Sequence, residues 1–116
     1  MSDTLTQTLG RFAHRLSYED LPAEVVEKSK TLIIHGIGVG LGGFNTEIGQ
    51  IGIEVAKKMA GGSAGEATIL VDGGKISPAA AVFANTAMFH SLFQDDSYEP
   101  GSIHIGPTVT PTALAV

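Results

Sequence analysis

Cysteine is absent from this sequence of 116 residues, and so is tryptophan. Without cysteine the chain can form neither a disulfide framework nor a thiolate metal site. Charge is also scarce, since Asp, Glu, Lys and Arg together make up 16% of the residues and the net charge is −5. The largest basic cluster is the pair Lys57-Lys58, so neither the amount nor the pattern of positive charge fits a nucleic-acid partner.

Long apolar runs are missing as well. The longest, TLIIHGIGVGLGGF, is too short to span a bilayer and contains His35. The N-terminal stretch MSDTLTQTLGRF has no basic segment followed by an apolar core, so we expect a cytoplasmic protein that is not secreted and has no membrane partner. Hydrophobic residues nevertheless reach 43%, with a mean hydropathy of +0.22, which indicates that some apolar surface is buried against something else.

Apolar residues recur at helical spacing over much of the chain. The spacing predicts five helical segments, which begin near Thr4, Pro22, Glu47, Pro78 and Pro111. Ser77 is expected to cap the fourth helix, which runs to about Gln94. The segment EATILVDGGKIS has β-prone residues before an Asp72-Gly73-Gly74 turn, and this pattern predicts a short hairpin. The fold class is therefore mainly α with one short β-hairpin and no parallel sheet.

Two of these helices carry marked apolar patterns. The third, from Glu47 to about Ala60, gathers four large apolar side chains on one face: Ile48, Ile51, Val55 and Met59. The fourth helix, PAAAVFANTAMFHSLFQ, is apolar nearly all round, which predicts that it is buried.

The glycine-rich run HGIGVGLGG allows two interpretations. Gly38, Gly40 and Gly43 match G-x-G-x-x-G, the dinucleotide-binding fingerprint, if the run is a loop after a strand. If the helix continues instead, the pairs Gly36/Gly40 and Gly38/Gly42 let a second helix approach closely. Helix packing is the favoured interpretation, because no acidic residue follows on a second predicted strand.

The stretch FQDDSYEPGSIH, residues 93–104, holds the densest group of ionisable side chains: Asp95, Asp96 and His104, with the hydroxyl of Ser97 beside them. Carboxylates and an imidazole near the end of a buried helix can act as acid and base. The same composition is ordinary for a solvated turn, and both interpretations stay open on spacing alone. Two acids and one histidine lack the spacing of a known ligand set, so no metal site is predicted. His90, inside the fourth helix, is interpreted as a hydrogen-bonded core histidine.

Several segments, taken in order, resemble one known family. LPAEVVEKSKTLIIHGIGVGLGG resembles the family's second helix, GEATILVDGGKISPAAAVFANTAMFHSLFQDDS its hairpin and following helix, and SIHIGPTVTPTALAV its H-P-G-x-x-V-x-P-A-x-L-A motif. The family is MmgE/PrpD, the 2-methylcitrate dehydratase-like proteins. The resemblance implies that residues 22–43 are helical. It also implies that residues 1–116 are the N-terminal portion of a helical domain that continues beyond this sequence.

The resemblance also implies a function. Family members act on small polycarboxylates without a metal or an organic cofactor, and they usually form homodimers. They transfer a proton or cleave a bond next to a carboxylate, as a dehydratase-like lyase or an epimerase such as iminodisuccinate epimerase. By position, His104 and Asp96 are expected to be catalytic, and Asp95 and Ser97 to bind or orient the substrate. We expect this activity of the full-length protein and not of the 116 residues alone.

Two departures qualify that expectation. Where many members read D-F-D-D-T, this chain has residues 93–97 as FQDDS, so Phe93 replaces the first aspartate. We therefore expect chemistry that differs from 2-methylcitrate dehydration, and an epimerase fits. The lysines and arginines are interpreted as solvated helix residues, except Lys75, which lies beside the hairpin turn. The cations that bind a polycarboxylate are therefore expected in the C-terminal part. The alternative is a non-enzymatic helical interaction module, whose apolar faces bind a partner chain.

Overall fold

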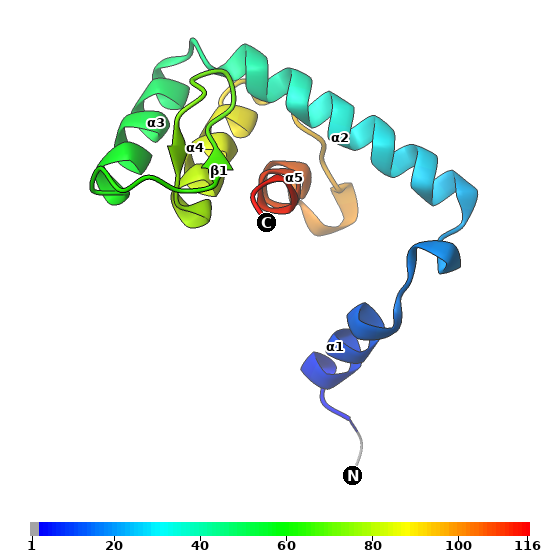
Figure 1. Cartoon of the computed structure of the whole chain (residues 1–116). Coiled ribbons are helices and arrows are strands. Elements are labelled where there is room, and N and C mark those ends of the chain that lie inside the picture. Colours follow the sequence, from blue (N-terminus) through cyan, green and yellow to red (C-terminus); the bar gives the residue numbers. More distant parts are fainter. Residues whose placement is uncertain (1–2) are drawn as a thin grey trace. The chain divides into compact units, whose positions relative to one another are not determined.

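The chain is mainly helical in the computed structural model, which describes residues 3–116 (Figure 1). The elements follow in the order α1 (Leu5–Arg15), α2 (Ala23–Gly43), α3 (Glu47–Met59), β1 (Ala67–Thr68), β2 (Lys75–Ile76), α4 (Pro78–His90) and α5 (Gly106–Leu114). Short 3-10 turns lie at Tyr18–Asp20 and Glu99–Gly101. The two strands pair antiparallel, with Ala67 opposite Ile76. Within the described residues this confirms the predicted fold class. None of these helices combines the length and the apolarity needed to cross a membrane.

The chain divides into two compact units, residues 1–30 and residues 31–116. In the described part of the first unit, α1 begins with a reciprocal cap, in which the Gln7 amide N–H donates to the Thr4 hydroxyl and the Gln7 side chain accepts from the Thr4 N–H. No residue of α1 is buried. Its apolar face is exposed and consists of Leu5, Leu9, Phe12 and Leu16. This helix therefore depends on its cap and its own backbone bonds.

In the second unit, the glycines of α2 lie against α4. A Cβ added at Gly36 would come within 3.1 Å of the Phe89 ring, and one at Gly40 would overlap that ring. A Cβ at Gly43 would overlap the backbone carbonyl of Met88. The run is thus helical, which confirms the packing interpretation for the pair Gly36/Gly40. It is wrong for the pair Gly38/Gly42, because a Cβ at Gly38 would meet nothing within 4 Å. The dinucleotide interpretation is wrong, because the three fingerprint glycines lie inside one helix.

The core is built from α3 and α4, which pack along each other, with the hairpin beside them (Figure 1). The buried residues of α3 are small or slender, namely Gly49, Gly52, Ile53 and Ala56. A Cβ at Gly52 would overlap the Cβ of Ala87, so the two backbones approach closely there. The face with the large apolar residues of α3 is exposed instead. Close backbone approach, rather than side-chain size, decides which face of α3 is buried.

Helix α4 is largely buried, as its composition predicts, although Phe83 is 45% exposed. Asn85 ties the hairpin segment to this helix, because its side chain accepts from the Leu70 N–H at 2.9 Å and donates to the Thr68 carbonyl at 3.0 Å. Ser77 occupies the cap position as expected, but its side chain makes no cap hydrogen bond. The helix ends at His90, earlier than predicted, and this end starts the loop that forms the candidate site.

Candidate active site

The loop between α4 and α5 brings a histidine back to the end of α4. Tyr98 and Ile103 form an isolated antiparallel bridge, in which the Tyr98 N–H donates to the Ile103 carbonyl at 2.8 Å. Between them lies the turn Glu99–Gly101, followed by Ser102 with a positive φ of 48°. The Pro-Gly composition of this turn is what allows the reversal. His104 consequently stands just before α5 and next to His90.

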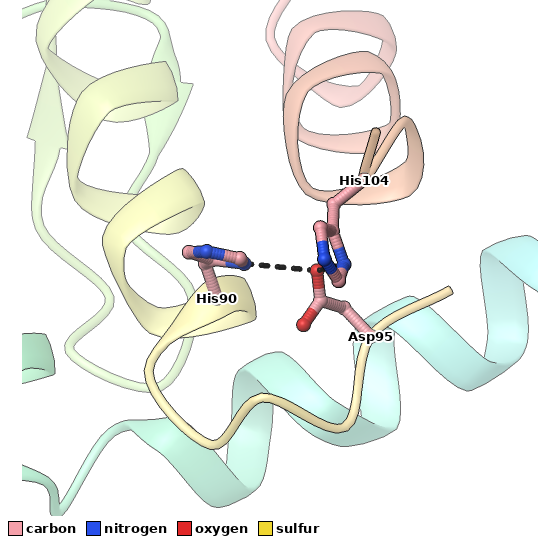
Figure 2. Close-up of side chains that lie close together, drawn as sticks. All are labelled: His90, Asp95 and His104. Atoms are coloured by element: carbon pink, nitrogen blue, oxygen red, sulfur yellow. Dashed lines mark hydrogen bonds and ion pairs between the residues drawn. The ribbon is translucent and has the colours of Figure 1, made fainter. Parts of the chain in front are cut away.

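One buried carboxylate binds both histidines (Figure 2). The Oδ2 atom of Asp95 lies 2.9 Å from Nδ1 of His90 and 3.0 Å from Nδ1 of His104. The Asp95 side chain is only 1% exposed, whereas the two imidazoles are 43% and 42% exposed. The other carboxylate oxygen, Oδ1, is buried and has no hydrogen-bond partner. A buried carboxylate in contact with two half-exposed imidazoles is an arrangement suited to proton transfer.

The other two predicted site residues have different contacts. Asp96 accepts the N–H of Gly106 at 3.2 Å and so binds the first turn of α5. A Cβ at Gly106 would overlap the Asp96 carboxylate, which explains why glycine stands there. Ser97 donates to Glu99 at 3.3 Å and is exposed. The structure thus brings Asp95 and His104 together, while Asp96 and Ser97 have structural contacts within the loop.

Two further side chains surround the loop. His35 of α2 has its Nε2 at 2.7 Å from the carbonyl oxygen of Gln94, which ties α2 to the loop. Phe93 is 73% exposed, with a positive φ of 51°, and its ring centroid lies 5.0 Å from that of His90. The residue at the position of the missing aspartate is therefore an apolar ring beside one of the two imidazoles.

A small cavity opens beside the histidines. It has a volume of about 190 Å³ and is lined by Thr86, His90, His104, Pro107 and Thr108. Neither lysine nor arginine is among these residues. His90 is the site residue that the sequence interpretation missed. The sequence signal that could have identified His90 is its place in the last turn of the predicted helix, five residues before Asp95.

The same three side chains offer ligand atoms for a metal ion. One atom each from His90, Asp95 and His104 lies within 4.8 Å of the others. Two imidazoles and a carboxylate form a donor set that Zn²⁺ accepts. The sequence prediction of no metal counted only His104, and His90 enlarges the set. A hydrogen bond to His90 and an ion-pair contact with His104 already account for both contacts of Oδ2, so the geometry by itself does not require an ion.

Comparison with known proteins shows the family of the chain. The model of the MmgE/PrpD N-terminal domain matches residues 7–116. The chain belongs to the MmgE/PrpD family. A cis-aconitate decarboxylase from Aspergillus terreus is 25% identical over 111 residues, which cover 96% of this chain and 22% of that protein. The human cis-aconitate decarboxylase is 28% identical over 121 residues, covering 99% of this chain and 24% of the relative.

This MmgE/PrpD chain thus spans about a quarter of the length of the curated relatives it matches. No solved structure matches it. The matched region includes the loop with Asp95 and His104, so the candidate site lies in the part that the family model covers.

Proposed function

We propose that the full-length protein acts on a small polycarboxylate and moves a proton at a carbon next to a carboxylate. His104 is the proton-transfer group, and Asp95 holds its Nδ1 edge. The observation that carries this proposal is the contact of 3.0 Å between His104 Nδ1 and the almost fully buried Asp95 carboxylate, beside an open cavity. An imidazole held in this way keeps its other nitrogen available to a substrate.

In this proposal, residues outside this chain form the remaining walls of the site. A cavity of about 190 Å³ is smaller than the roughly 300–1,000 Å³ of typical small-molecule pockets. No lysine or arginine lines it, although a polycarboxylate needs cations for binding. These cations belong to the C-terminal part or to a second subunit of a homodimer. We expect such a homodimer, located in the cytoplasm, and no activity of residues 1–116 alone.

The reaction belongs to the lyases or the epimerases. The names of the relatives, cis-aconitate decarboxylases, favour a lyase. Phe93 favours chemistry other than 2-methylcitrate dehydration, because it puts an apolar ring where family members have a carboxylate. Removing a positioned acid–base group typically lowers a rate by about 10² to 10⁴-fold. Efficient dehydration of methylcitrate would therefore contradict the altered-chemistry part of the proposal.

A substrate panel on the full-length protein tests the function. The panel contains methylcitrate, citrate, cis-aconitate and iminodisuccinate, and products are followed by NMR. We expect turnover of one of them, reduced about 10² to 10⁴-fold by His104→Asn. Asn retains a donor toward Asp95 but transfers no proton. A matched control is His14→Asn on the exposed side of α1, which should leave the rate unchanged. No turnover of any substrate, or a His104→Asn rate within a few-fold of the parent, contradicts the proposal.

A second candidate function has a specific observation in its favour. The apolar face of α1 is exposed, with Phe12 at 64% and Leu9 at 59%, as expected of a helix that binds a partner chain. A non-enzymatic interaction module would be favoured if the full-length protein were inactive on the whole panel. It would also have to form a stoichiometric complex that Phe12→Asp abolishes.

A further inference from the structure

Two imidazoles in this site contact the same carboxylate oxygen. Nδ1 of His90 is hydrogen-bonded to Asp95 Oδ2 at 2.9 Å, Nδ1 of His104 lies 3.0 Å from the same atom as an ion-pair contact, and the two ring centroids are 5.2 Å apart in an edge-on arrangement. The proposed function uses only His104. The second ring, which has the better-formed contact with the buried carboxylate, therefore needs an explanation.

The tautomer of His90 follows from its hydrogen bond to the carboxylate. Because a carboxylate accepts hydrogen bonds, neutral His90 has its proton on Nδ1 and its lone pair on Nε2 at the opposite edge. We expect the same tautomer at His104, whose Nδ1 faces Oδ2 at 3.0 Å. In the described part of the chain neither Nε2 has a hydrogen-bond partner. Both rings line the same cavity of about 190 Å³. Two free imidazole nitrogens therefore border one space large enough for part of a substrate.

We propose that His90 is a second catalytic residue, which acts with His104 as an acid–base pair on the substrate of the proposed function, on which this inference rests. Asp95 is the positioning residue for both rings. A pair of groups in which one is neutral and the other protonated can remove a proton and deliver another in the same turnover.

The pair suits the elimination of water from a hydroxylated polycarboxylate. Neutral His104 takes the proton from the carbon next to a carboxylate, and the C–H electron pair is delocalised into that carboxylate. These two electrons then form the C=C bond while the C–O bond to the neighbouring carbon breaks. Protonated His90 gives its proton to the departing hydroxyl, which leaves as water. His104 ends protonated and His90 neutral, so the number of protons is conserved, and exchange with solvent restores the starting state.

The shared carboxylate also favours a lyase over an epimerase. Inverting a carbon by two groups requires an acid and a base on opposite faces of that carbon. His90 and His104 contact one oxygen atom and line one cavity, so they approach a substrate from the same side. Syn elimination on adjacent carbons uses such a one-sided approach. The inference thus narrows the reaction class that Phe93 alone leaves between lyase and epimerase.

The first arm of the test is independent of turnover. Full-length protein labelled with ¹⁵N-histidine is studied by long-range ¹H–¹⁵N NMR, and the spectra of His90→Asn and His104→Asn assign the two rings. We expect both rings to carry the proton on Nδ1 when neutral. The tautomer with the proton on Nε2 at His90 overturns the inference. So does a stoichiometric divalent metal ion that the purified protein holds and His90→Asn loses, since the ion would then occupy the Nδ1 atoms.

The second arm uses kinetics on citrate, the panel substrate that has a hydroxyl group and that Phe93 does not disfavour. A parent that converts cis-aconitate or iminodisuccinate but not citrate overturns the elimination. His90→Asn is expected to lower kcat by about 10² to 10⁴-fold while KM changes less than about threefold, because Asn retains a donor toward Asp95 but transfers no proton. In D₂O this variant should still exchange the substrate C–H, whereas His104→Asn should lose exchange and turnover together. His14→Asn is the control, and matching thermal unfolding curves show that the variants fold.

The outcomes separate the two proposals. An active parent with a His90→Asn kcat within a few-fold of its own overturns the role of His90 and leaves His104 as the proton-transfer group. A His90→Asn variant that loses C–H exchange as completely as His104→Asn also overturns the division of labour between acid and base. A parent that converts none of the panel substrates overturns the proposed function and this inference with it.

Discussion

The contact between α2 and α4 gives the sharpest test of the fold. Gly40 and Gly38 lie in the same helix, two residues apart, yet their surroundings differ completely. A Cβ at Gly40 would overlap the ring of Phe89, which is fully buried, whereas a Cβ at Gly38 meets nothing within 4 Å. Gly40→Ala and Gly38→Ala therefore make the same chemical change in a closely packed and in an open position of one helix.

The expected free energies follow from two opposing effects. Replacing Gly by Ala inside a helix stabilises it by roughly 1 kcal/mol where the methyl group has room. Forcing a methyl group into a packed core costs typically about 1–3 kcal/mol, because the neighbours must leave their preferred rotamers. Gly38→Ala should therefore gain about 0.5–1 kcal/mol, and Gly40→Ala should lose about 1–2 kcal/mol. The two variants should differ by about 1.5–3 kcal/mol in the free energy of unfolding.

Urea unfolding at 25 °C, followed by far-UV circular dichroism, measures this difference. Extrapolation to zero urea adds an error of about 10–15% to each free energy of unfolding. This error is smaller than the expected difference between the two variants. The double variant Gly40→Ala/Phe89→Leu supplies an internal check, since removing the ring should relieve the overlap and shrink the cost of the added methyl group. Equal stability of Gly40→Ala and Gly38→Ala, or an unchanged cost of Gly40→Ala in the Phe89→Leu background, would refute the close packing of these helices.

Three further predictions concern the hairpin, the N-terminal turn and the loop. Asn85→Leu should lower the free energy of unfolding by about 2–3 kcal/mol, because it removes two hydrogen bonds from a residue that is 2% exposed; an unchanged urea midpoint would contradict this. Hydrogen bonds from the Ser17 hydroxyl and N–H hold the pKa of Asp20 below its ordinary value of 3.8. Their stabilisation is therefore present above that value and lost as the pH falls through the lower pKa, and an NMR titration should show the midpoint rising in Ser17→Ala. Gly106→Ala should push away the Asp96 carboxylate and speed hydrogen exchange in the first turn of α5, and unchanged exchange would disprove the overlap.

The helices and the hairpin were predictable because local signals agree with the fold. Apolar spacing, Pro78 at a helix start and the Asp72-Gly73-Gly74 turn each depend on a few neighbouring residues. The glycine run was ambiguous on these grounds. A helix was favoured there by the lack of an acidic residue on a second predicted strand and by the resemblance to MmgE/PrpD proteins. The packing of this run against Phe89 explains the ambiguity. The glycines make room for a residue far along the chain, and no local sequence pattern shows such a contact.

The buried face of α3 could not be predicted from the size of its side chains. Periodicity identifies an apolar face, here with Ile48 and Ile51, but not whether a partner lies on it. In the structure both are 53% exposed, and the face with Gly52 is buried against Ala87. The sequence composition indicated that some apolar surface is buried against something else, and the exposure of this face fits that expectation.

The candidate site was predicted in part, for a related reason. Asp95 and His104 were recognised as neighbours along the loop, and they are in contact. His90 was assigned to the core because helical periodicity places it among apolar residues. The early end of α4 turns its ring toward Asp95, and the length of a helix is the least certain part of a prediction from sequence.

Phe93 occupies a strained backbone position in the loop. Its φ of 51° lies in the left-handed region, which costs a non-glycine residue roughly 1–2 kcal/mol and which Asp and Asn adopt more readily. The aspartate that the resemblance leads one to expect there would suit this backbone position better than phenylalanine does. With phenylalanine in place, the loop brings Asp95 to both imidazoles. Compared with that expected aspartate, Phe93 lacks a negative charge and places an apolar ring beside His90. Asp95 is left as the one carboxylate that contacts the two rings in the described residues, which is why both the proposed function and the acid–base pair depend on it.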